Sequence, residues 1–440
     1  MRKVTGKVLT YDNEFNGIIK DGKNVYSIPN VIYNETIEVD VDGKPLRAKV
    51  LEKSPNRITP PCEIYYQCGG CKLLHIKYEE QLRMKTELVR KLFADHFGKG
   101  VLVNPCLGMV KPCNYRNKNQ VVFGNHPKEK LISGFYAENT HKIIPFKTCY
   151  VQDEISDKIV GKIKEILIKM HISAYDEDRK RGLVRHVMVK RSFKTKETMV
   201  VVVTAEENFP GRSNFVKAVT AQCKEVTTIV QNINTRSTSA VLGNKENILY
   251  GKGYIIDELC GKKFKISSKS FYQINPYQTE VLYNSAIDNA GLKMSDTILD
   301  AYSGVGTIGL IASSRVRKVL SVEIEKSAVI DAQFNAKINN IKNVSFFNDD
   351  ASNFIVNLAN RKEHMDAIIM DPPRSGSDER FLKAVLKLMP EKIIYISCNP
   401  HTQVTDLKLL VDKYEMTYIQ PVDMFPHTAH VESVVCLTRR

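Results

Sequence analysis

Long apolar segments are absent from this sequence of 440 residues. Its apolar stretches are short, such as residues 200–203, and none reaches the roughly 18 residues that a membrane-spanning helix needs. Residues 1–5 also lack the apolar core of a signal peptide. We therefore expect a cytoplasmic protein. A small domain that depends on disulfides or a metal for its stability is excluded as well, because a chain of this length suffices for roughly three domains.

Acidic residues are fewer than basic ones, 49 against 64, and the net charge is +15. The excess is confined to one part of the chain. Residues 271–440 contain 18 basic and 20 acidic side chains, which leaves 46 and 29, a net charge of +17, in residues 1–270. Clustered lysines and arginines bind polyanions by releasing counterions. Of the two polyanions to consider, a membrane surface and a nucleic acid, the sequence favours a nucleic acid.

Residues 1–55 are interpreted as a first domain. Apolar and polar positions alternate there over short stretches, and Asp21-Gly22 and Asp42-Gly43 are turn signals. Several short strands at this spacing predict a small OB-like β-barrel, a fold that often binds nucleic acid. A β-module without that function fits the pattern about as well.

Residues 56–270 are interpreted as a central α+β domain that binds RNA. It begins in a proline-rich linker and continues into an amphipathic helix expected over residues 78–97. Residues 179–191, which hold six of the basic side chains, are expected to form a turn and a strand. A charge run of this kind is usually a solvated face, but the charge of the whole region favours contact with RNA or DNA.

Residues 271–440 show strands and helices in alternation. The pattern predicts a doubly wound, Rossmann-like α/β sheet, since mostly apolar strands separated by helices are typical of parallel sheets. The predicted strands are 297–302, 318–322, 344–347, 367–370, 392–396 and 432–437, with helices such as 326–339 and 378–389 between them.

Three cysteines, Cys62, Cys68 and Cys71, lie within ten residues, and two glycines separate the last pair. In a chain without a signal peptide, such a run indicates metal ligands or reactive thiols more than disulfides. We choose Cys149 as the fourth ligand over Cys106, Cys113, Cys223 and Cys260. Four thiolates satisfy zinc and an iron-sulfur cluster equally, so the metal stays open at this point.

Residues 304–309 read G-x-G-x-x-G between a predicted strand and a helix, which alone could indicate NAD. Glu323 ends the next strand and is placed to accept ribose hydroxyls for either cofactor. Asp350 follows the third strand, where it could accept from an adenine amino group. Asp371 opens Asp-Pro-Pro-Arg after the fourth strand, and this motif favours S-adenosylmethionine over NAD because it has no obvious use in hydride transfer.

Cys398, in Ser-Cys-Asn-Pro, follows the fifth strand at the carboxyl edge where such sheets bind ligands. A lone cysteine is more often a buried apolar residue, but the Asn-Pro turn favours a nucleophile here. Glu432 starts the last strand after two histidines. It is either a solvated carboxylate or a general base.

Together these motifs resemble the RNA uridine-5 methyltransferase family, and more narrowly its iron-sulfur-containing 23S ribosomal RNA branch. The resemblance covers almost the whole chain, including an N-terminal segment similar to the TRAM domain and the sequence Phe-Tyr-Gln-Ile-Asn at 271–275. It implies 5-methyluridine formation, with a [4Fe-4S] cluster on Cys62, Cys68, Cys71 and Cys149. It also implies a donor site for S-adenosyl-L-methionine formed by Gln273, Tyr302, Thr307, Glu323, Asp350 and Asp371.

The resemblance further implies that Cys398 adds to carbon 6 of uracil and that Glu432 removes the hydrogen at carbon 5. The partner would be RNA, most simply 23S ribosomal RNA, with rRNA processing as the role. Three rivals are a transfer RNA uridine methyltransferase, a non-catalytic RNA-binding or assembly protein, and an NAD oxidoreductase. The transfer RNA enzymes of the family commonly lack the barrel and the cysteine run, which favours ribosomal RNA. Methylation of an adenine amino group is disfavoured because Arg374, and no aromatic residue, follows the two prolines.

Overall fold

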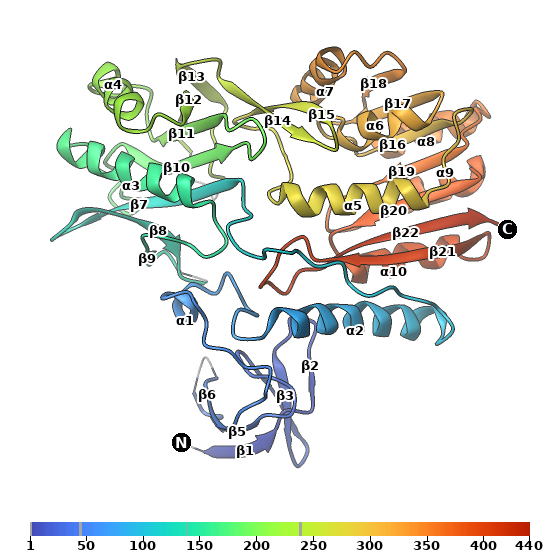
Figure 1. The fold of residues 1–440 in the computed structure, drawn as a ribbon, viewed down its shortest axis with the longest axis horizontal. Helices are drawn as coiled ribbons and strands as arrows, with labels where there is room; N and C mark the ends of the chain where they lie inside the picture. Colours follow the sequence, from blue (N-terminus) through green and yellow to red (C-terminus); the bar gives the residue numbers. More distant parts are fainter. Residues whose placement is uncertain (1, 44–45, 139, 237–239) are drawn as a thin grey trace.

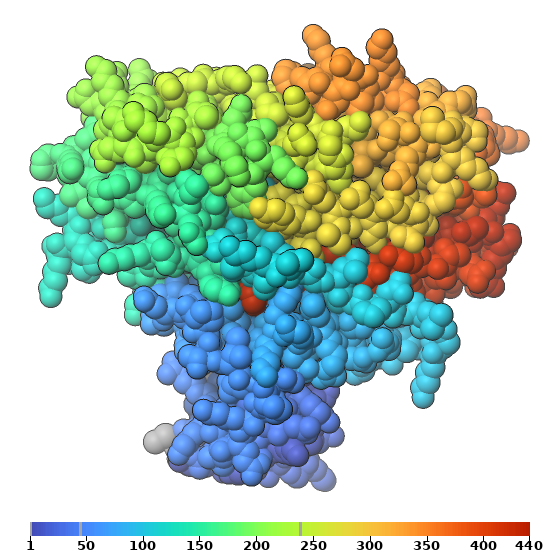
Figure 2. All heavy atoms as spheres, viewed as in Figure 1, coloured from blue at the N-terminus to red at the C-terminus, as the bar shows by residue number. Residues whose placement is uncertain are grey.

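The computed structural model describes residues 2–43, 46–138, 140–236 and 240–440. A small β-rich unit formed by the N-terminal residues projects from a broad body in which a central and a C-terminal sheet lie side by side (Figures 1 and 2). Over these residues, no helix combines the length and the apolar character that crossing a membrane would require.

Residues 3–52 form two three-stranded sheets, in the orders β1-β5-β6 and β2-β3-β4. Alternate side chains of both sheets, Val4 and Ile19 among them, meet in one small core. The predicted strands and the turn at Asp21-Gly22 are confirmed, although Val25 points outward and is 60% exposed. The strands are β1 (Lys3–Lys7), β2 (Thr10–Tyr11), β3 (Gly17–Asp21), β4 (Asn24–Ile28), β5 (Thr36–Asp40) and β6 (Ala48–Glu52).

The central sheet has seven strands in the order β13-β12-β11-β10-β7-β8-β9. Helices α3 (Glu154–Lys169) and α4 (Arg212–Gln222) bury their apolar faces against it. Asp153 caps α3 by accepting a hydrogen bond from the Ser156 amide, as the start of a helix requires. The strands are β7 (Lys118–His126), β8 (Lys130–Tyr136), β9 (Ile143–Pro145), β10 (Val184–Arg191), β11 (Thr198–Thr204), β12 (Val226–Ile233) and β13 (Lys245–Tyr250).

The C-terminal sheet has the order β18-β17-β16-β19-β20-β22-β21, and only β22 runs antiparallel to its neighbours. The predicted doubly wound α/β fold is confirmed, and each predicted strand agrees within two residues. The strands are β16 (Thr297–Ala301), β17 (Lys318–Glu323), β18 (Val344–Asn348), β19 (Ala367–Met370), β20 (Lys392–Ser397), β21 (Tyr414–Val422) and β22 (Glu432–Arg439).

Helices cover both faces of this sheet because successive strand residues, such as Ile298 and Leu299, point to opposite faces and are both buried. One face packs against α5, α6 and α7, and the other against α2, α8, α9 and α10. The helices are α2 (Tyr78–Phe97), α5 (Pro276–Asn289), α6 (Thr307–Ala312), α7 (Lys326–Ile338), α8 (Ala351–Asn360), α9 (Glu379–Leu388) and α10 (Pro400–Leu410), with the short η1 (Ser313–Arg315) after α6.

Helix α2 has the predicted bounds, and its predicted apolar face, with Val89 and Phe93, is buried. That face packs on α10 and the C-terminal core, although α2 lies far from this domain in sequence (Figure 1). A hairpin of β14 (Tyr254–Leu259) and β15 (Lys262–Ser267) contacts both the central sheet and α5 to α7. The short helix α1 (Tyr65–Cys68) lies in the cysteine segment.

Candidate active site

Strand pairing brings Cys398 and Glu432 to the same edge of the C-terminal sheet. Ser397, the last residue of β20, pairs with Ser433 of the antiparallel strand β22. One step further along this register, Cys398 lies opposite Glu432, close enough for Glu432 to raise the pKa of its thiol. Asp371 follows β19, the parallel neighbour of β20. A thiol and two carboxyl groups therefore meet at one edge of the sheet.

Burial changes the acidity of all three groups. Burial and the nearby Asp371 raise the pKa of Glu432 to about 8. Burial raises the pKa of Asp371 to about 7. The pKa of the Cys398 thiol is also raised, by burial and then by Glu432 and Asp371. Neither carboxyl group receives a hydrogen bond from a described residue, and desolvation without such bonds favours the neutral acid. The site can therefore hold and release protons near neutral pH.

Arg374 supplies the positive charge at this site. Its charge lowers the pKa of the Cys398 thiol and also that of Glu432. The backbone carbonyl of Arg374 accepts hydrogen bonds from Asn399 Nδ2 at 3.1 Å and Thr402 Oγ1 at 3.3 Å, which fix it beside the start of α10. Its Nη2 also lies 3.4 Å from His430 Nε2. In the sequence, Arg374 was noted as part of the Asp-Pro-Pro-Arg motif and as evidence against methylation of an adenine amino group, so its role beside the thiol was not predicted.

The glycine turn between β16 and α6 brings its backbone close to the end of β17. The Gly304 amide donates to Glu323 Oε2 at 2.8 Å. Gly306 has a φ of +79°, and a Cβ atom there would lie 3.1 Å from the Ala332 side chain, so a larger residue would strain the turn. Asp300 accepts from the Gly309 amide at 2.9 Å and from Ser321 Oγ at 3.2 Å, which fixes the start of α6. This local geometry leaves the strand edge open to a ligand.

Five of the six predicted donor residues follow successive parallel strands. Tyr302 and Thr307 follow β16, and Glu323, Asp350 and Asp371 lie at the ends of β17, β18 and β19. The Asp350 side chain is partly occupied, because Oδ1 accepts from the Asn353 amide at 3.0 Å and caps α8. Each carboxylate oxygen retains a second lone pair for a ligand. The Tyr302 hydroxyl donates to Ser377 Oγ at 3.3 Å.

The sixth predicted residue, Gln273, approaches from the chain before α5. Its backbone carbonyl accepts from Asn117 Nδ2 at 3.1 Å, which ties it to the central sheet. Its side chain lies close enough to the hydroxyl of Tyr283 of α5 to lower the pKa of that buried residue, which burial and the nearby Asp371 and Glu432 raise. Tyr283 thus lies between the predicted donor site and the predicted base. No sequence pattern indicated this residue, since its spacing matches the apolar face of a helix.

The four cysteines chosen from the sequence come together. Burial, and after it the neighbouring thiols of Cys149, Cys68 and Cys62, raise the pKa of Cys71 to about 12, although the charge of Arg116 opposes this rise. All four are free thiols. No three His, Cys, Asp or Glu side chains within the described ranges are arranged as ligands around one ion. Thiolates are the ligands that zinc and iron-sulfur clusters take, so these residues supply the right donor type without the arrangement of a formed site.

The basic run at residues 179–191 is mostly internal, which corrects the expectation that the whole run faces nucleic acid. Its strand, β10, lies inside the central sheet. Arg185 is paired with Glu177 at 2.7 Å, Arg191 lies 3.2 Å from Asp153, and Lys190 donates to two backbone carbonyls. The charges of β10 are buried because these partners neutralise or bind them. The exposed cations are those of the preceding turn, Arg179, Lys180 and Arg181.

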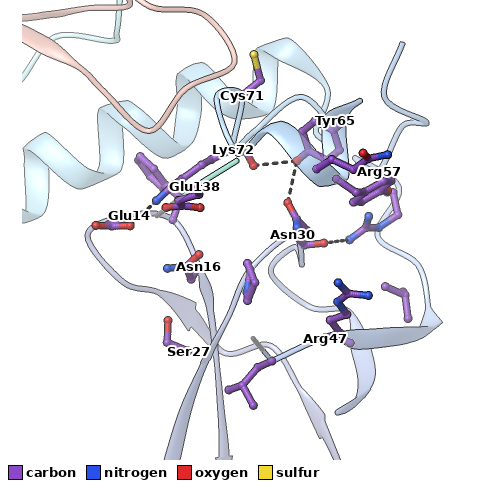
Figure 3. A pocket seen from close by; sticks show the side chains of 18 residues that line it. Glu14, Asn16, Ser27, Asn30, Arg47, Arg57, Tyr65, Cys71, Lys72 and Glu138 are labelled. Carbon is purple, nitrogen blue, oxygen red and sulfur yellow. Dashed lines mark hydrogen bonds and ion pairs between the residues drawn. The ribbon is translucent and has the colours of Figure 1, made fainter. Parts of the chain in front are cut away.

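A pocket of about 860 Å³ lies between the N-terminal unit and the cysteine segment (Figure 3). Tyr65 hydrogen-bonds Asn30 Oδ1 at 2.9 Å across it. Arg57 is neutralised by buried Glu35, whereas Arg47 forms no ion pair with a described residue. Tyr66 also lines the pocket and is 69% exposed. A cation without an ion-pair partner among the described residues and an exposed aromatic ring, both lining one pocket, suit single-stranded RNA.

The sheet order, the glycine turn and the acidic residues after successive strands define a class, the S-adenosylmethionine-dependent methyltransferases of Rossmann-like fold. Residues 217–440 match the family described as tRNA (Uracil-5-)-methyltransferase. The chain belongs to this family, and it is an S-adenosylmethionine-dependent RNA (uracil-5-)-methyltransferase.

Whole-chain similarities agree with this family. The chain is 41% identical to an uncharacterized RNA methyltransferase of Staphylococcus aureus strain MRSA252, over 98% of this chain and 96% of that protein. It is also 41% identical to an uncharacterized RNA methyltransferase of Clostridium tetani, over 99% and 91%. The solved structure of Pyrococcus abyssi tRNA (uracil-54, C5)-methyltransferase with S-adenosyl-L-homocysteine superposes with a TM-score of 0.80 at 26% identity and covers 99% of both chains.

This solved structure corrects one argument from the sequence. We expected transfer RNA enzymes of the family to lack the N-terminal unit, yet a transfer RNA enzyme matches 99% of this chain. A match of that extent includes the N-terminal residues. The presence of the unit therefore does not separate ribosomal from transfer RNA substrates.

Proposed function

We propose that this enzyme methylates carbon 5 of a uridine in 23S ribosomal RNA through a covalent intermediate on Cys398. The observation that carries the proposal is the meeting of Cys398, Glu432 and Asp371 at one sheet edge, with Arg374 beside the thiol. Carbon 5 of uracil is a weak nucleophile, so a catalyst must first change the electronic structure of the ring. A thiol beside a cation and a proton acceptor suits that task.

The Cys398 thiolate forms a bond from Sγ to carbon 6 of the uracil. The electrons of the 5,6 double bond move toward the carbonyl at carbon 4, and the resulting enolate attacks the methyl carbon through carbon 5. S-adenosylmethionine, when bound, would supply that methyl group on a sulfonium, and the electrons of the broken sulfur–methyl bond would stay on the sulfur of the departing S-adenosylhomocysteine. The ionised Glu432 then takes the proton that remains on carbon 5, the double bond forms again, and the bond between Sγ and carbon 6 breaks.

The donor would be held by the six residues Gln273, Tyr302, Thr307, Glu323, Asp350 and Asp371. Their positions after successive strands support this assignment, because ligands of open α/β sheets bind beyond the carboxyl ends of the strands. Glu323 suits ribose hydroxyls, since its carboxylate already lies against the Gly304 amide of the turn. Asp350 suits the adenine amino group.

The first two domains, proposed as residues 1–55, a TRAM-like barrel, and 56–270, would bind the RNA, and 271–440 would carry the chemistry. The net charge of +17 on residues 1–270 supports this division. Arg47 and Tyr66 at the pocket of Figure 3 are suited to a phosphate and a base. The target uridine must leave its stack to reach Cys398, and a basic platform would hold the opened RNA. A cytoplasmic location follows from such a substrate.

We also propose that Cys62, Cys68, Cys71 and Cys149 hold a [4Fe-4S] cluster. The four neighbouring thiols support it, and Arg116 would offset part of the negative charge of the bound group. The cluster would act structurally, because methyl transfer to uridine needs no electron. Anaerobically purified enzyme should contain about four iron and four sulfide per chain, and Cys71→Ser should lose them while Cys260→Ser retains them. Stoichiometric zinc in a colourless protein would contradict the cluster.

A second candidate substrate is transfer RNA, favoured by the similarity to the Pyrococcus abyssi enzyme. Mapping 5-methyluridine in ribosomal and transfer RNA from cells with and without the gene distinguishes the two. Loss of 5-methyluridine from 23S RNA alone supports our proposal. Loss from transfer RNA alone would show that transfer RNA, and not 23S RNA, is the substrate.

The mechanism is tested with labelled methyl donor and purified RNA. Cys398→Ala should give no labelled RNA, and Glu432→Gln should accumulate a labelled RNA-protein adduct. Labelled RNA from Cys398→Ala would overturn the covalent mechanism, whereas rapid release of product by Glu432→Gln would overturn only the role of the base.

A further inference from the structure

The loop of residues 423–431, which joins β21 to β22 and ends immediately before Glu432, is held by distant parts of the chain. We call it the 423–431 loop. In Figure 1 it extends from the β21-β22 hairpin toward the segments that contain α1 and α2. Its Met424 carbonyl accepts from Asn275 Nδ2 at 2.9 Å, and its Pro426 carbonyl accepts from the Tyr115 hydroxyl at 3.0 Å. The loop is therefore anchored by elements that lie far from it in sequence.

His427 is the centre of these contacts. It is buried and has a φ of +70°, a left-handed conformation that is costly for a residue with a Cβ atom and needs support from its surroundings. Its Nε2 lies 2.7 Å from the Pro112 carbonyl. A carbonyl only accepts, so Nε2 carries the hydrogen and Nδ1 is left to accept from Gln81 Nε2 at 3.2 Å. Burial lowers the pKa of His427 to about 4, which keeps this neutral form.

Gln81 of α2 hydrogen-bonds both the ring and the backbone amide of His427. Its Oε1 accepts from the His427 amide at 3.1 Å, and its Nε2 also donates to the Leu73 carbonyl at 3.0 Å. The Leu73 amide in turn donates to the His427 carbonyl at 2.9 Å. Leu73 is two residues from Cys71. The cysteine segment, α2 and the 423–431 loop therefore form one hydrogen-bonded unit.

The start of the loop is fixed by an ion pair. Lys85 Nζ lies 2.6 Å from Asp423 Oδ1, and neither side chain is exposed. The Tyr78 hydroxyl donates to Asp423 Oδ2 at 2.9 Å. Between His427 and Glu432, Thr428 Oγ1 donates to the Phe425 carbonyl at 2.8 Å and accepts from the His430 amide at 3.3 Å. These short-range bonds make the loop stiff enough to transmit the position of His427 to Glu432.

We propose that Gln81 and His427 are positioning residues that set Glu432 for removal of the proton at carbon 5. The proposal rests on the proposed role of Glu432 as the base. A carboxylate that must reach a proton on one face of a bound ring depends on placement within about 1 Å. Cys398 directly follows β20 and takes its position from that strand rather than from this loop. Loss of the clamp formed by Gln81 and His427 should therefore slow elimination of the adduct more than its formation and methylation.

The test measures two quantities in a single turnover of the full-length enzyme with its substrate RNA and labelled methyl donor. One is the labelled RNA-protein adduct, and the other is the released labelled RNA. His427→Ala and Gln81→Met should raise the ratio of adduct to released RNA at least tenfold over wild type. His427→Gln, whose amide can still donate toward Pro112, should restore part of the release.

Tyr414→Phe is the matched control. Tyr414 is fully buried at the far end of β21, where its hydroxyl donates to the Pro390 carbonyl at 3.0 Å, so the variant loses one buried hydrogen bond in the same hairpin. Its ratio should equal that of wild type. An equal fall of adduct and released RNA in His427→Ala and Gln81→Met, or an unchanged ratio, would overturn the proposal. If Glu432→Gln accumulates adduct and the clamp variants do not, only the clamp is wrong; if none accumulates adduct, the base assignment fails as well.

Discussion

Cys398 and Glu432 face one another across the β20-β22 pair, one residue beyond the paired Ser397 and Ser433. They are 34 positions apart in the sequence, and the antiparallel last strand is what brings them together. A sheet that remained parallel throughout would place the start of its last strand at the opposite edge. Because β22 runs in the opposite direction, Glu432 at its start can act beside Cys398 and Asp371, which follow β20 and β19.

Arg374 should control the reactivity of Cys398. Because its charge lowers the pKa of the thiol, Arg374→Ala should raise that pKa and slow alkylation of Cys398 by iodoacetamide at pH 8 by roughly tenfold. Methyl transfer should fall in parallel and recover at higher pH. Arg380→Ala, which removes an exposed cation from α9, serves as the control. An unchanged alkylation rate in Arg374→Ala would contradict this role.

The rate of turnover should rise with pH between about 7 and 9. Burial raises the pKa of Glu432 to about 8 and raises the pKa of Cys398, and both groups act in their ionised forms. Raising the pH therefore increases the reactive fraction of each. Single-turnover rates measured across this range check the prediction. A rate that is flat or falls over the range would show that neither group limits the reaction in its ionised form.

Glu432→Gln should stabilise the protein at neutral pH. Between the ordinary pKa of 4.5 and the raised pKa of about 8, the unfolded chain loses the Glu432 proton while the folded protein retains it. The free energy of unfolding therefore falls as pH rises through this interval, and glutamine removes that loss. We expect a gain of about 3 kcal/mol at pH 7 and almost none near pH 4 by urea denaturation. Glu415→Gln, at an exposed position of β21, should show no such pH-dependent gain.

The exposed turn and the buried strand of residues 179–191 should respond differently to substitution. Replacing Arg179, Lys180 and Arg181 together with alanine should weaken RNA binding and reduce the salt dependence of the binding constant by about 1 to 3 in log-log slope. Arg185→Ala should instead destabilise the fold, because it leaves Glu177 and two backbone carbonyls without their donor. Equal RNA affinity in the triple variant would exclude the turn from the interface.

Much of the C-terminal fold could be predicted because its strands are continuous apolar runs and its helices have one apolar face. Strand β21 was not predicted, since polar residues such as Glu415 and Gln420 interrupt its apolar pattern near the edge of the sheet. The packing of α2 on the C-terminal core was also not predicted, because the apolar face of a helix does not identify its partner. Its distance in sequence from α10 is too large for local patterns to indicate the contact.

The candidate site also contains residues that could be predicted from the sequence and residues that could not. Cys398, Glu432 and Asp371 could be found because they follow or start predicted strands, and strand ends meet at one edge. Tyr283 and Gln81 could not, because each has the pattern of an ordinary helical residue and acquires its role only from side chains far along the chain. The interpretation of the β10 cations as a nucleic-acid contact was wrong for a related reason. Whether a charged side chain is buried and paired depends on the folded sheet, and the sequence alone does not show it.

The covalent role of Cys398 is tested most directly by trapping. RNA that contains 5-fluorouridine at the target site carries fluorine where the proton to be removed would be, so the base cannot complete elimination. The enzyme with methyl donor should form a stable complex, and mass spectrometry should find the methylated fluorouracil nucleotide on the peptide that contains Cys398 and nowhere else. Cys398→Ala should form none, whereas Cys260→Ser should form as much as wild type. A complex attached to another residue, or 5-methyluridine formed by Cys398→Ala, would contradict the account.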